Sequence, residues 1–316
     1  MVDSKHQWKA WLYLAPALIL LLVFTVWPII NTVRIAFLED YNSLYALNPY
    51  MDYNPEVGFK NFKDVFMEGS DFLQCLKTTM LLCVLTVPLS TFLALLIAVC
   101  LNAIRPLQRF LQTIFFLPYV TNSIAIGMVF AAMFNIIGNV SSAAGIVSSV
   151  GIVNNVIELF GGQYINWVNA GSSYAANIAV MTVYIVWNAL PFKILILLGG
   201  LQSINKQYYD AAKVDGTSRV RVFGRITVPL LSPMLAYVVI TGFIGGFKEY
   251  SSIVGVFGKN MGPMQNYELN TMVGFIYSSL FQYKHGRASA AALILFGIIL
   301  VVTLINLYVS KKKVHY

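Results

Sequence analysis

Charge is the scarcest feature of this 316-residue sequence. Asp, Glu, Lys and Arg together supply 11% of the residues, whereas hydrophobic residues supply 58%. Soluble domains carry roughly a quarter of their residues as charged side chains, so this composition indicates an integral membrane protein. The basic excess gives a net charge of +8, but these residues lie in short connections between apolar runs and form no patch interleaved with aromatic residues. This distribution argues against a nucleic-acid partner and for membrane topology.

Metal ligands and catalytic motifs are also missing. The three cysteines, Cys75, Cys83 and Cys100, all lie in or beside one apolar stretch, which predicts packing within a membrane helix rather than a metal site. The sequence contains no G-x-x-x-x-G-K-[ST] phosphate loop, no G-x-S-x-G turn and no H-E-x-x-H motif. We therefore expect a non-catalytic chain that binds neither a metal nor a cofactor.

Long apolar runs are what the sequence does contain. A helix needs about 20 apolar residues to cross the hydrocarbon core, and six runs reach that length. They predict an all-α, polytopic membrane protein in which residues 1–316 form a single domain. The first run follows Lys5 and Lys9, as a secretory signal would, but it is longer than a signal peptide's apolar region and no cleavage site follows, so we interpret it as a retained helix. The expected spans are 10–37, 76–103, 110–136, 173–203, 228–254 and 287–310.

The connections between these spans differ in character. No charged residue lies between Arg109 and Glu158, so this region has room for one span plus a re-entrant or surface-lying piece. Residues 137–172 are rich in Gly, Ser and Asn, and we expect an outside loop with short helical pieces there. The other outside loops are expected at 38–75 and 255–286. Within the first of them, residues 57–66 alternate apolar and charged residues near helical spacing, which predicts an amphipathic surface helix.

Basic residues in short loops set the orientation of a membrane protein. Here four segments with basic residues fall on one side of a six-span topology and nine carboxylates fall on the other, so we expect both termini to be cytoplasmic. The basic set is Lys5, Lys9, Arg105, Arg109, Lys206, Lys213, Arg219, Arg221, Arg225 and Lys311 to Lys313; the acidic set is Glu39, Asp40, Asp52, Glu56, Asp64, Glu68, Asp71, Glu158 and Glu268.

The cytoplasmic connection at 204–227 is unlike an ordinary linker. Ala211 and Ala212 favour a helix, and the carboxylates of Asp210 and Asp215 lie on either side of them. Gly216 then permits a turn that a side chain would obstruct. Small residues let a helix lie deep in a partner's groove, where carboxylates pair with basic groups. Both a docking surface and a solvated connector fit these features, and docking is favoured. Further anchors are expected at Phe223, Ile226 and Pro229.

The same segment resembles the coupling signature of permease subunits in binding-protein-dependent ABC importers. The matching string is Tyr209-Asp210-Ala211-Ala212-Lys213-Val214-Asp215-Gly216, followed by Phe223, Ile226-Thr227 and Pro229-Leu230-Leu231, and it is similar to the maltose and glycerol-3-phosphate permeases of the carbohydrate branch. The signature usually opens with Glu, where this chain has Asp210, and Thr217 replaces a common Ala. Other matching segments, in the same order as in the first of the two permeases, are Leu14–Ala17, Trp27-Pro28, Gly58–Phe62, Leu117–Tyr119, Trp187–Pro191 and Gly200–Ile204.

The resemblance implies a complete transport machine with several subunits. It implies the six-helix architecture of type I importer permeases in a bacterial or archaeal inner membrane. The expected partners are a second, non-identical permease, two ATPase subunits that bind ATP and Mg²⁺, an extracytoplasmic solute-binding protein and membrane lipid. The implied cargo is a sugar or oligosaccharide, and the implied role of the 204–227 segment is coupling to the ATPase.

A few charges interrupt the apolar spans and are candidates for a solute path. A charge at mid-bilayer costs at least about 2.5 kcal/mol, so Lys193, Lys248 and Glu249 are expected to face protein or water. Phe247 and Tyr250 flank Lys248 and Glu249, and this mixture of aromatic faces and polar head groups suits a sugar. Gly242, Gly245 and Gly246 precede them and favour close packing or local unwinding. Snorkelling at the outer interface is the alternative for Lys248 and Glu249, and Lys193 suits either a path or an interhelical ion pair. Tyr277 and Tyr283 are further candidates for the path or an outer gate.

Other functions remain open at this stage. Lys193 and Lys248 would also serve an anionic or non-sugar solute, such as a phosphate ester. An ion-coupled secondary transporter would need more intramembrane carboxylates than Glu249 and a repeated half, and a membrane enzyme would need a catalytic constellation at bilayer depth. The sequence displays neither.

Overall fold

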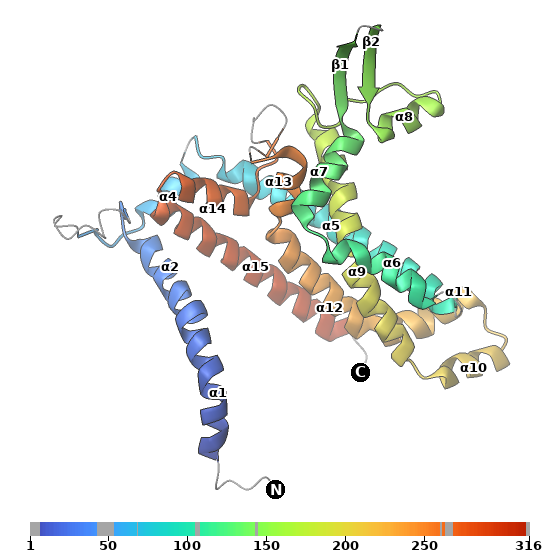
Figure 1. Cartoon of the computed structure of the whole chain (residues 1–316). Helices are drawn as coiled ribbons and strands as arrows, with labels where there is room; N and C mark the ends of the chain where they lie inside the picture. The colour runs from blue at the N-terminus through green and yellow to red at the C-terminus, as the bar shows by residue number, and fades with distance from the viewer. Residues whose placement is uncertain are drawn as a thin grey trace. The chain divides into compact units, whose positions relative to one another are not determined.

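Helices dominate the computed structural model of the chain (Figure 1). The structure describes residues 7–42, 54–67, 69–104, 108–142, 145–259, 261–262 and 268–313. Among the charges used to orient the chain, Lys5, Asp52, Glu68 and Arg105 lie outside these described residues.

The described helices confirm the all-α membrane fold. Five of them are long and apolar enough to cross a membrane, and a pair of helices bent by 97° makes a sixth when the pair is counted as one span. The bent pair occupies the stretch where the sequence allowed one span plus a re-entrant piece. The observed spans are Trp8–Phe37, Phe72–Ala103, the pair Phe110–Val120 with Ser123–Phe134, Tyr174–Ser203, Arg219–Phe247 and His285–Lys311.

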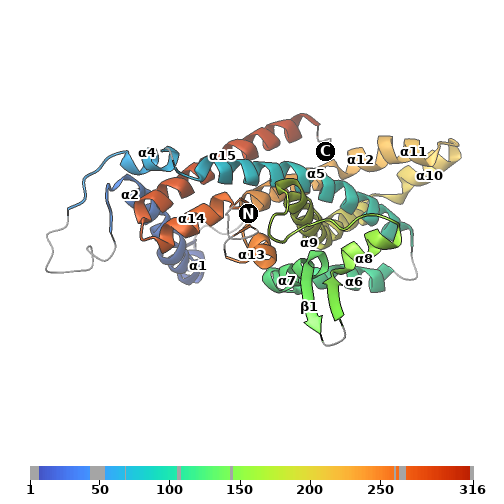
Figure 2. The same ribbon diagram turned by 90° about the horizontal axis from the view of Figure 1, so that it is seen from above.

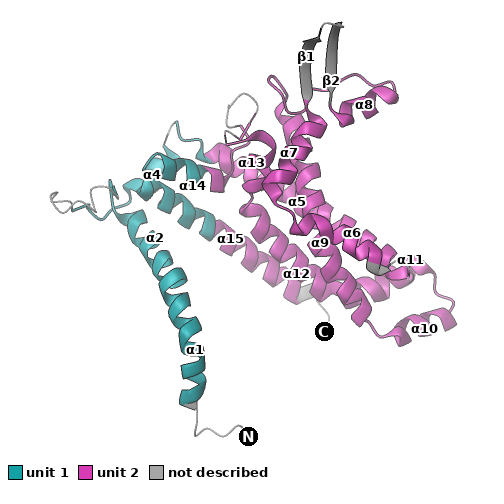
Figure 3. Ribbon diagram, in the orientation of Figure 1, with its two compact units in different colours: residues 1–72, 275–296 teal, residues 73–274, 297–316 magenta. Residues whose placement is uncertain are grey.

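The chain divides into two compact units (Figure 3). Unit 1 consists of residues 1–72 and 275–296, and unit 2 consists of residues 73–274 and 297–316. The helix α14 (Met272–Phe281) and the helix α15 (His285–Lys313) both cross this division.

The first span, in unit 1, is one long helix with a π-helical turn inside it. It comprises α1 (Gln7–Leu21), η2 (Leu22–Val26) and α2 (Trp27–Phe37). Pro28 lies two residues after the last residue of this π turn, and Pro229 lies two residues after the last residue of a second one, η3 (Phe223–Thr227). Proline has no N–H to donate to the carbonyl four residues earlier, so the register of the helix slips there. Side chains such as Phe24, 73% exposed, leave this span an apolar surface suited to lipid.

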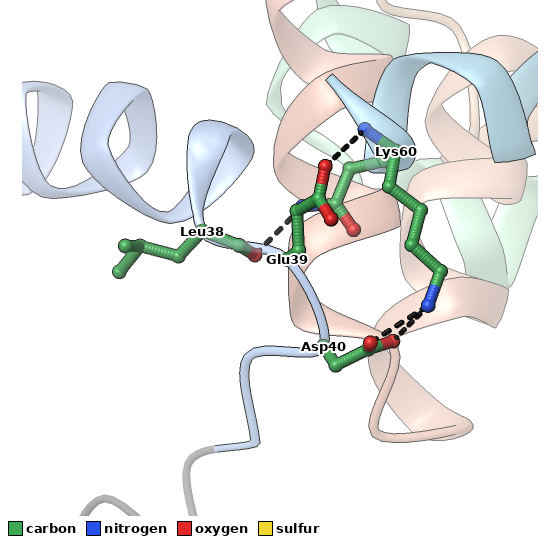
Figure 4. Close-up of polar contacts among 5 residues, drawn as sticks. Leu38, Glu39, Asp40 and Lys60 are labelled. Carbon is green, nitrogen blue, oxygen red and sulfur yellow. Dashed lines mark hydrogen bonds and ion pairs between the residues drawn. The ribbon is translucent and has the colours of Figure 1, made fainter. Parts of the chain in front are cut away.

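A polar clamp closes the end of the first span against the short helix α4 (Lys60–Phe66), as Figure 4 shows. The Lys60 ammonium donates to both carboxylate oxygens of Asp40 at 2.7 Å, and its backbone N–H donates to Glu39 Oε1 at 3.1 Å. The hydrogen bond to Asp40 raises the pKa of the Lys60 ammonium above its usual value. Asn61 Nδ2 donates to the carbonyl oxygens of Ala36 and Leu38 at 3.1 and 2.8 Å.

Two glycines let this clamp close. A Cβ on Gly58 would lie 1.9 Å from Glu39 Oε1, and a Cβ on Gly286 would lie 2.4 Å from Asn61 Oδ1. The helix expected at 57–66 is present as α4. Lys60 and Asn61, at its start, form hydrogen bonds with the end of the first span. The Lys60–Asp40 ion pair is itself exposed, at 47% and 77% for the two side chains, so its own contribution to stability is small.

Unit 2 is built around the long helix α9 (Tyr174–Ser203). Three helices pack around the C-terminal half of α9: α5 (Phe72–Ala103), α6 (Gln108–Val120) and α12 (Val228–Phe247). Leu197 and Leu198 are almost fully buried there. Figures 1 and 2 both place α6 alongside α9. All three cysteines lie on α5, where Cys75 and Cys83 are buried and Cys100 is exposed.

The other half of α9 contacts two short helices that each follow a break in a span. These are α7 (Ser123–Phe134), after the bend in span three, and α13 (Ser251–Phe257), after the end of α12. They cross at glycines, because a Cβ on Gly127 would lie 2.6 Å from Gly255 Cα. Asn122 caps α7 by accepting from the N–H of Ile124 at 2.8 Å, which stabilises a helix start immediately after the bend.

The loop expected at 137–172 contains strands that the sequence analysis did not predict. The strands β1 (Ile136–Ser142) and β2 (Gly145–Val150) pair antiparallel, and one short helix, α8 (Ile152–Leu159), follows. The expectation of helical pieces was therefore right only for α8. The β-branched residues Ile146, Val147 and Val150 of β2 favour a strand, and the glycine and serine content of the loop obscured this signal.

Candidate solute path and coupling surface

The segment between spans four and five begins with the capped helix α10 (Lys206–Val214). Asn205 accepts a hydrogen bond from the N–H of Gln207 at 3.0 Å, which satisfies one of the unpaired donors of the first turn. The predicted helix is thus present, and it begins one turn before Asp210.

Gly216 ends α10 in a Schellman motif. The N–H of Thr217 donates to the Ala212 carbonyl at 3.0 Å, and the N–H of Gly216 donates to the Lys213 carbonyl at 3.1 Å. This pair of bonds requires the left-handed conformation at position 216, and Gly216 has φ of +64°. No atom lies within 4 Å of the position that a Cβ would occupy. The backbone conformation, rather than packing, therefore requires glycine here.

The residues predicted for docking lie mostly on the exposed side of α10. Ala211 and Asp215 are exposed, whereas Ala212 is buried, with 5% of its surface exposed. Asp210 accepts from Lys213 Nζ at 3.1 Å, but the two side chains are 67% and 78% exposed. An ion pair so open to solvent holds its carboxylate weakly. Asp210 is therefore free to exchange this partner for a cation on another chain.

A second helical stretch holds α10 in place. It consists of α11 (Arg219–Val222) and η3, and it continues without a break into α12. The hydroxyls of Tyr209 and Thr227 lie 3.3 Å apart, and a cavity of about 660 Å³ lies between the two helical stretches. Phe223 lines this cavity, and Ile226 and Pro229 are half-buried.

A separate cavity of about 280 Å³ lies among α5, α6, α9 and α12. It brings together Lys193 and Glu249, which the sequence analysis singled out. It does not include Phe247, Lys248 or Tyr250 among its lining residues. The polar side chains that line it are Thr86, Ser90, Tyr119, Asn188, Lys193, Thr241 and Glu249.

Lys193 connects α9 to α5 rather than forming an ion pair. Its ammonium donates to Ser90 Oγ at 2.7 Å, to Thr91 Oγ1 at 3.0 Å and to the Val87 carbonyl at 3.2 Å. The residue is 5% exposed. This interhelical contact is made with hydroxyls and a carbonyl instead of the carboxylate of an ion pair, and a role of Lys193 in the path stays a prediction.

The glycines of span five allow α12 to approach α5 and Lys193. A Cβ on Gly242 would lie 3.2 Å from Lys193 Nζ, and one on Gly246 would lie 2.5 Å from Cys83 Sγ. Gly245 faces open space. Close packing, one of the two expectations for these glycines, therefore applies to Gly242 and Gly246.

Span five ends earlier than predicted, because its helix stops at Phe247 instead of continuing to 254. The N–H groups of Lys248 and Glu249 donate to the carbonyls of Gly245 and Gly246 at 3.0 and 3.1 Å, so the last turn tightens and α13 begins anew. Paired glycines weaken a helix interior, which the sequence analysis allowed as local unwinding. Phe247 is buried, with 2% of its surface exposed, whereas Lys248 is exposed and Tyr250 is half-buried.

The two tyrosines before span six lie in unit 1. Tyr277, on α14, is 43% exposed and stacks on Phe281 with ring centroids 6.5 Å apart. Tyr283 lines another cavity, of about 450 Å³, together with Asp64 and Arg287. Their role in a gate stays a prediction.

The sequence analysis missed the aromatic wall of the 280 Å³ cavity. Tyr119 of α6 stacks on Phe192 of α9, with centroids 5.9 Å apart and ring planes 18° apart, and Asn188 lies one turn before Phe192. Leu117–Tyr119 and Trp187–Pro191 were noticed only as family markers. Their convergence depends on the packing of two distant helices, which spacing along one chain does not reveal.

Comparison with known proteins decides the family. Residues 87–315, more than half of the chain, match the family described as binding-protein-dependent transport system inner membrane component. The chain belongs to this family. It is a transport permease of the inner membrane, and the matched part includes α10 and all but Thr86 of the residues that line the 280 Å³ cavity. The family match decides against the ion-coupled transporter and the membrane enzyme.

Individual relatives and a solved structure are similar to nearly the whole chain. A probable ABC transporter permease protein of Mycoplasma pneumoniae is 27% identical over 93% of this chain and 83% of its own length. A trehalose/maltose transport system permease protein of Thermococcus litoralis is 28% identical over 99% of this chain and 98% of its own length. A bacterial ABC transporter that imports the acidic polysaccharide alginate contains a chain of the same fold, with a TM-score of 0.76, 21% identity and 98% and 96% coverage.

Proposed function

We propose that this permease is one of two non-identical membrane subunits of an ATP-driven importer for a sugar or oligosaccharide. An extracytoplasmic binding protein delivers the solute, and two ATPase subunits, which bind ATP and Mg²⁺, dock on α10. Both termini and α10 then lie on the cytoplasmic side, where Lys206, Lys213 and Arg219 satisfy the distribution of basic residues expected there.

The observation that carries the docking proposal is the rigid, exposed α10. Its start is capped by Asn205, its end is fixed by Gly216, and two of its large apolar side chains face outward: Tyr208 is 53% exposed and Val214 is 88% exposed. Tyr208, Ala211 and Val214 recur every third residue, so they are neighbours along the helix. An exposed apolar row bordered by carboxylates suits a partner groove with basic edges.

The sugar assignment is supported by the cavity and by a relative. Stacked Tyr119 and Phe192 offer an aromatic surface, and Asn188 offers an amide that both donates and accepts. Such a mixture of apolar wall and few polar groups is typical of small-molecule sites. The trehalose/maltose relative, which aligns over nearly the whole chain, transports sugars according to its description.

The mechanism follows from the docking contact. ATP closes the ATPase dimer and moves α10, and the stiff connection through α11 and η3 transmits this displacement to α12, a wall of the cavity. Spans three to six then rock so that the path opens outward, and hydrolysis resets it. Only a ligand with different affinities for the two states can drive such a change, and here that ligand is ATP on the partner.

A matched pair of substitutions at Ala211 tests the docking. Ala211→Arg places a long side chain on the exposed face of α10, while Ala211→Ser keeps it small. In affinity purification of the tagged permease, we expect Ala211→Arg to reduce the recovered ATPase by about thirtyfold, the loss typical of a disrupted interface hot spot. Ala211→Ser should retain it.

Recovery of the second permease serves as the assembly control, because its contacts are made within the membrane. If Ala211→Arg retained both the ATPase and nucleotide-dependent uptake, α10 would not be the docking element.

A further inference from the structure

The two charged side chains that line the 280 Å³ cavity, Lys193 and Glu249, both form hydrogen bonds with the protein. An ammonium has three protons to donate, and Lys193 directs all three at α5: to Ser90, to Thr91 and to the Val87 carbonyl, at 2.7 to 3.2 Å. No proton of Lys193 remains for a phosphate, sulfate or carboxylate of a solute.

Glu249 is occupied in a different way. Its Oε1 accepts from the N–H of Ser252 at 3.2 Å, in the first turn of α13. The carboxylate therefore satisfies a backbone donor that the helix start leaves unpaired, and it lies at the positive end of the peptide dipoles. Between Lys193 and Glu249 themselves, both described, the structure has no ion pair. Each charge is stabilised by its own helix contacts.

The remaining polar and aromatic groups of the cavity are uncharged. Asn188 lines the cavity and makes no hydrogen bond with any of the residues that the structure describes. Tyr119 and Phe192 form the stacked wall, and Tyr119 is 52% exposed. An anion that enters the cavity gives up part of its hydration, and the one cation of the lining, Lys193, has its three protons committed to α5. A hydroxyl-rich neutral molecule instead finds an amide to exchange hydrogen bonds with and a ring to lie against.

We infer that the solute accepted in this cavity is uncharged and that Asn188 and the Tyr119–Phe192 pair contact it, whereas Lys193 and Glu249 hold the helices that form the walls. This inference rests on the proposed function, because it takes the cavity to be the solute path. It excludes the phosphate ester or other anion that Lys193 alone would suggest.

Matched neutral and acidic sugars test the inference without knowledge of the natural cargo. The assembled transporter carries Ala189→Cys, a thiol on the cavity wall, together with Cys100→Ser, since Cys100 is exposed and Cys75 and Cys83 are buried. The rate of labelling by N-ethylmaleimide is measured with methyl β-D-glucopyranoside or methyl β-D-glucuronide, which differ only by hydroxymethyl against carboxylate. The corresponding galactoside and galacturonide form a second pair.

We expect the neutral member of at least one pair to slow labelling by about threefold or more, the factor that one net hydrogen bond is worth. The acidic member at the same concentration should have no effect. Asn188→Ala should remove the protection, whereas Lys193→Gln, measured in assembled complexes, should leave the neutral preference in place.

The outcomes separate the inference from the proposed function. Equal or better protection by the acidic sugars, or loss of the neutral preference in Lys193→Gln, overturns the inference and leaves the cavity as the path. A labelled cysteine that no sugar protects, or one that is never labelled in the assembled transporter, overturns the assignment of the cavity as the path itself.

Discussion

Replacing Gly216 with valine is expected to lower uptake by more than about tenfold while the permease still inserts in the membrane. A residue with a Cβ pays roughly 1–2 kcal/mol in the left-handed conformation, and a β-branched side chain tolerates it least. Because φ at this position is +64°, valine would release the hydrogen bonds from Gly216 to Lys213 and from Thr217 to Ala212. The last turn of α10 would then unravel, and each 1.4 kcal/mol is a factor of ten in the docking-competent population.

The matched control is Gly216→Asn at the same position. Asparagine is the non-glycine residue most often found in this conformation, and no neighbour lies within 4 Å of a Cβ. We expect Gly216→Asn to retain most of the uptake and ATPase coupling. Equal activities for the valine and asparagine variants would show that the turn geometry does not matter for transport.

Gly127→Ala is expected to destabilise the permease by about 1–3 kcal/mol, the usual cost of overpacking. The new Cβ would lie 2.6 Å from Gly255 Cα and 2.7 Å from Gly255 C. These neighbours are backbone atoms, so no side chain can rotate away, and α7 must separate from α13. The midpoint of thermal unfolding of the purified complex measures the effect, and uptake should fall with it.

Gly199→Ala on α9 is the control for Gly127→Ala, because no atom lies within 4 Å of a Cβ there. Alanine favours a helix over glycine by about 1 kcal/mol, so this variant should be as stable as the wild type or more so. A Gly127→Ala variant with the same midpoint as Gly199→Ala would contradict the close crossing of the two helices.

Local sequence signals predicted α10 and its turn well. Asn205, the alanines and Gly216 act through contacts within a few residues, so the order of residues carries the information. The six apolar runs were equally visible, because each must span the bilayer with its own residues. The end of span five was predicted too late, because the run stays apolar beyond the break after Phe247 and its composition does not mark where the helix stops.

The cavity could be predicted only in part. Lys193 and Glu249 stand out as charges in apolar runs, but the sequence does not reveal what they contact. Lys193 reaches residues of α5 about a hundred positions away, and Tyr119 meets Phe192 only because α6 packs on α9. Such contacts arise from tertiary packing. Because of this packing, the Lys193 ammonium donates its protons to α5 instead of remaining free.

The central claim is that this permease moves solute only when a separate ATPase acts on α10. Its most direct test is uptake of radiolabelled maltose, trehalose and lactose into proteoliposomes that contain either the purified permease alone or the permease with its co-purified subunits. The account predicts accumulation of at least one sugar only in the complete assembly, with ATP and Mg²⁺ on the ATPase side and the binding protein on the other. Nucleotide-independent uptake by the permease alone would contradict it.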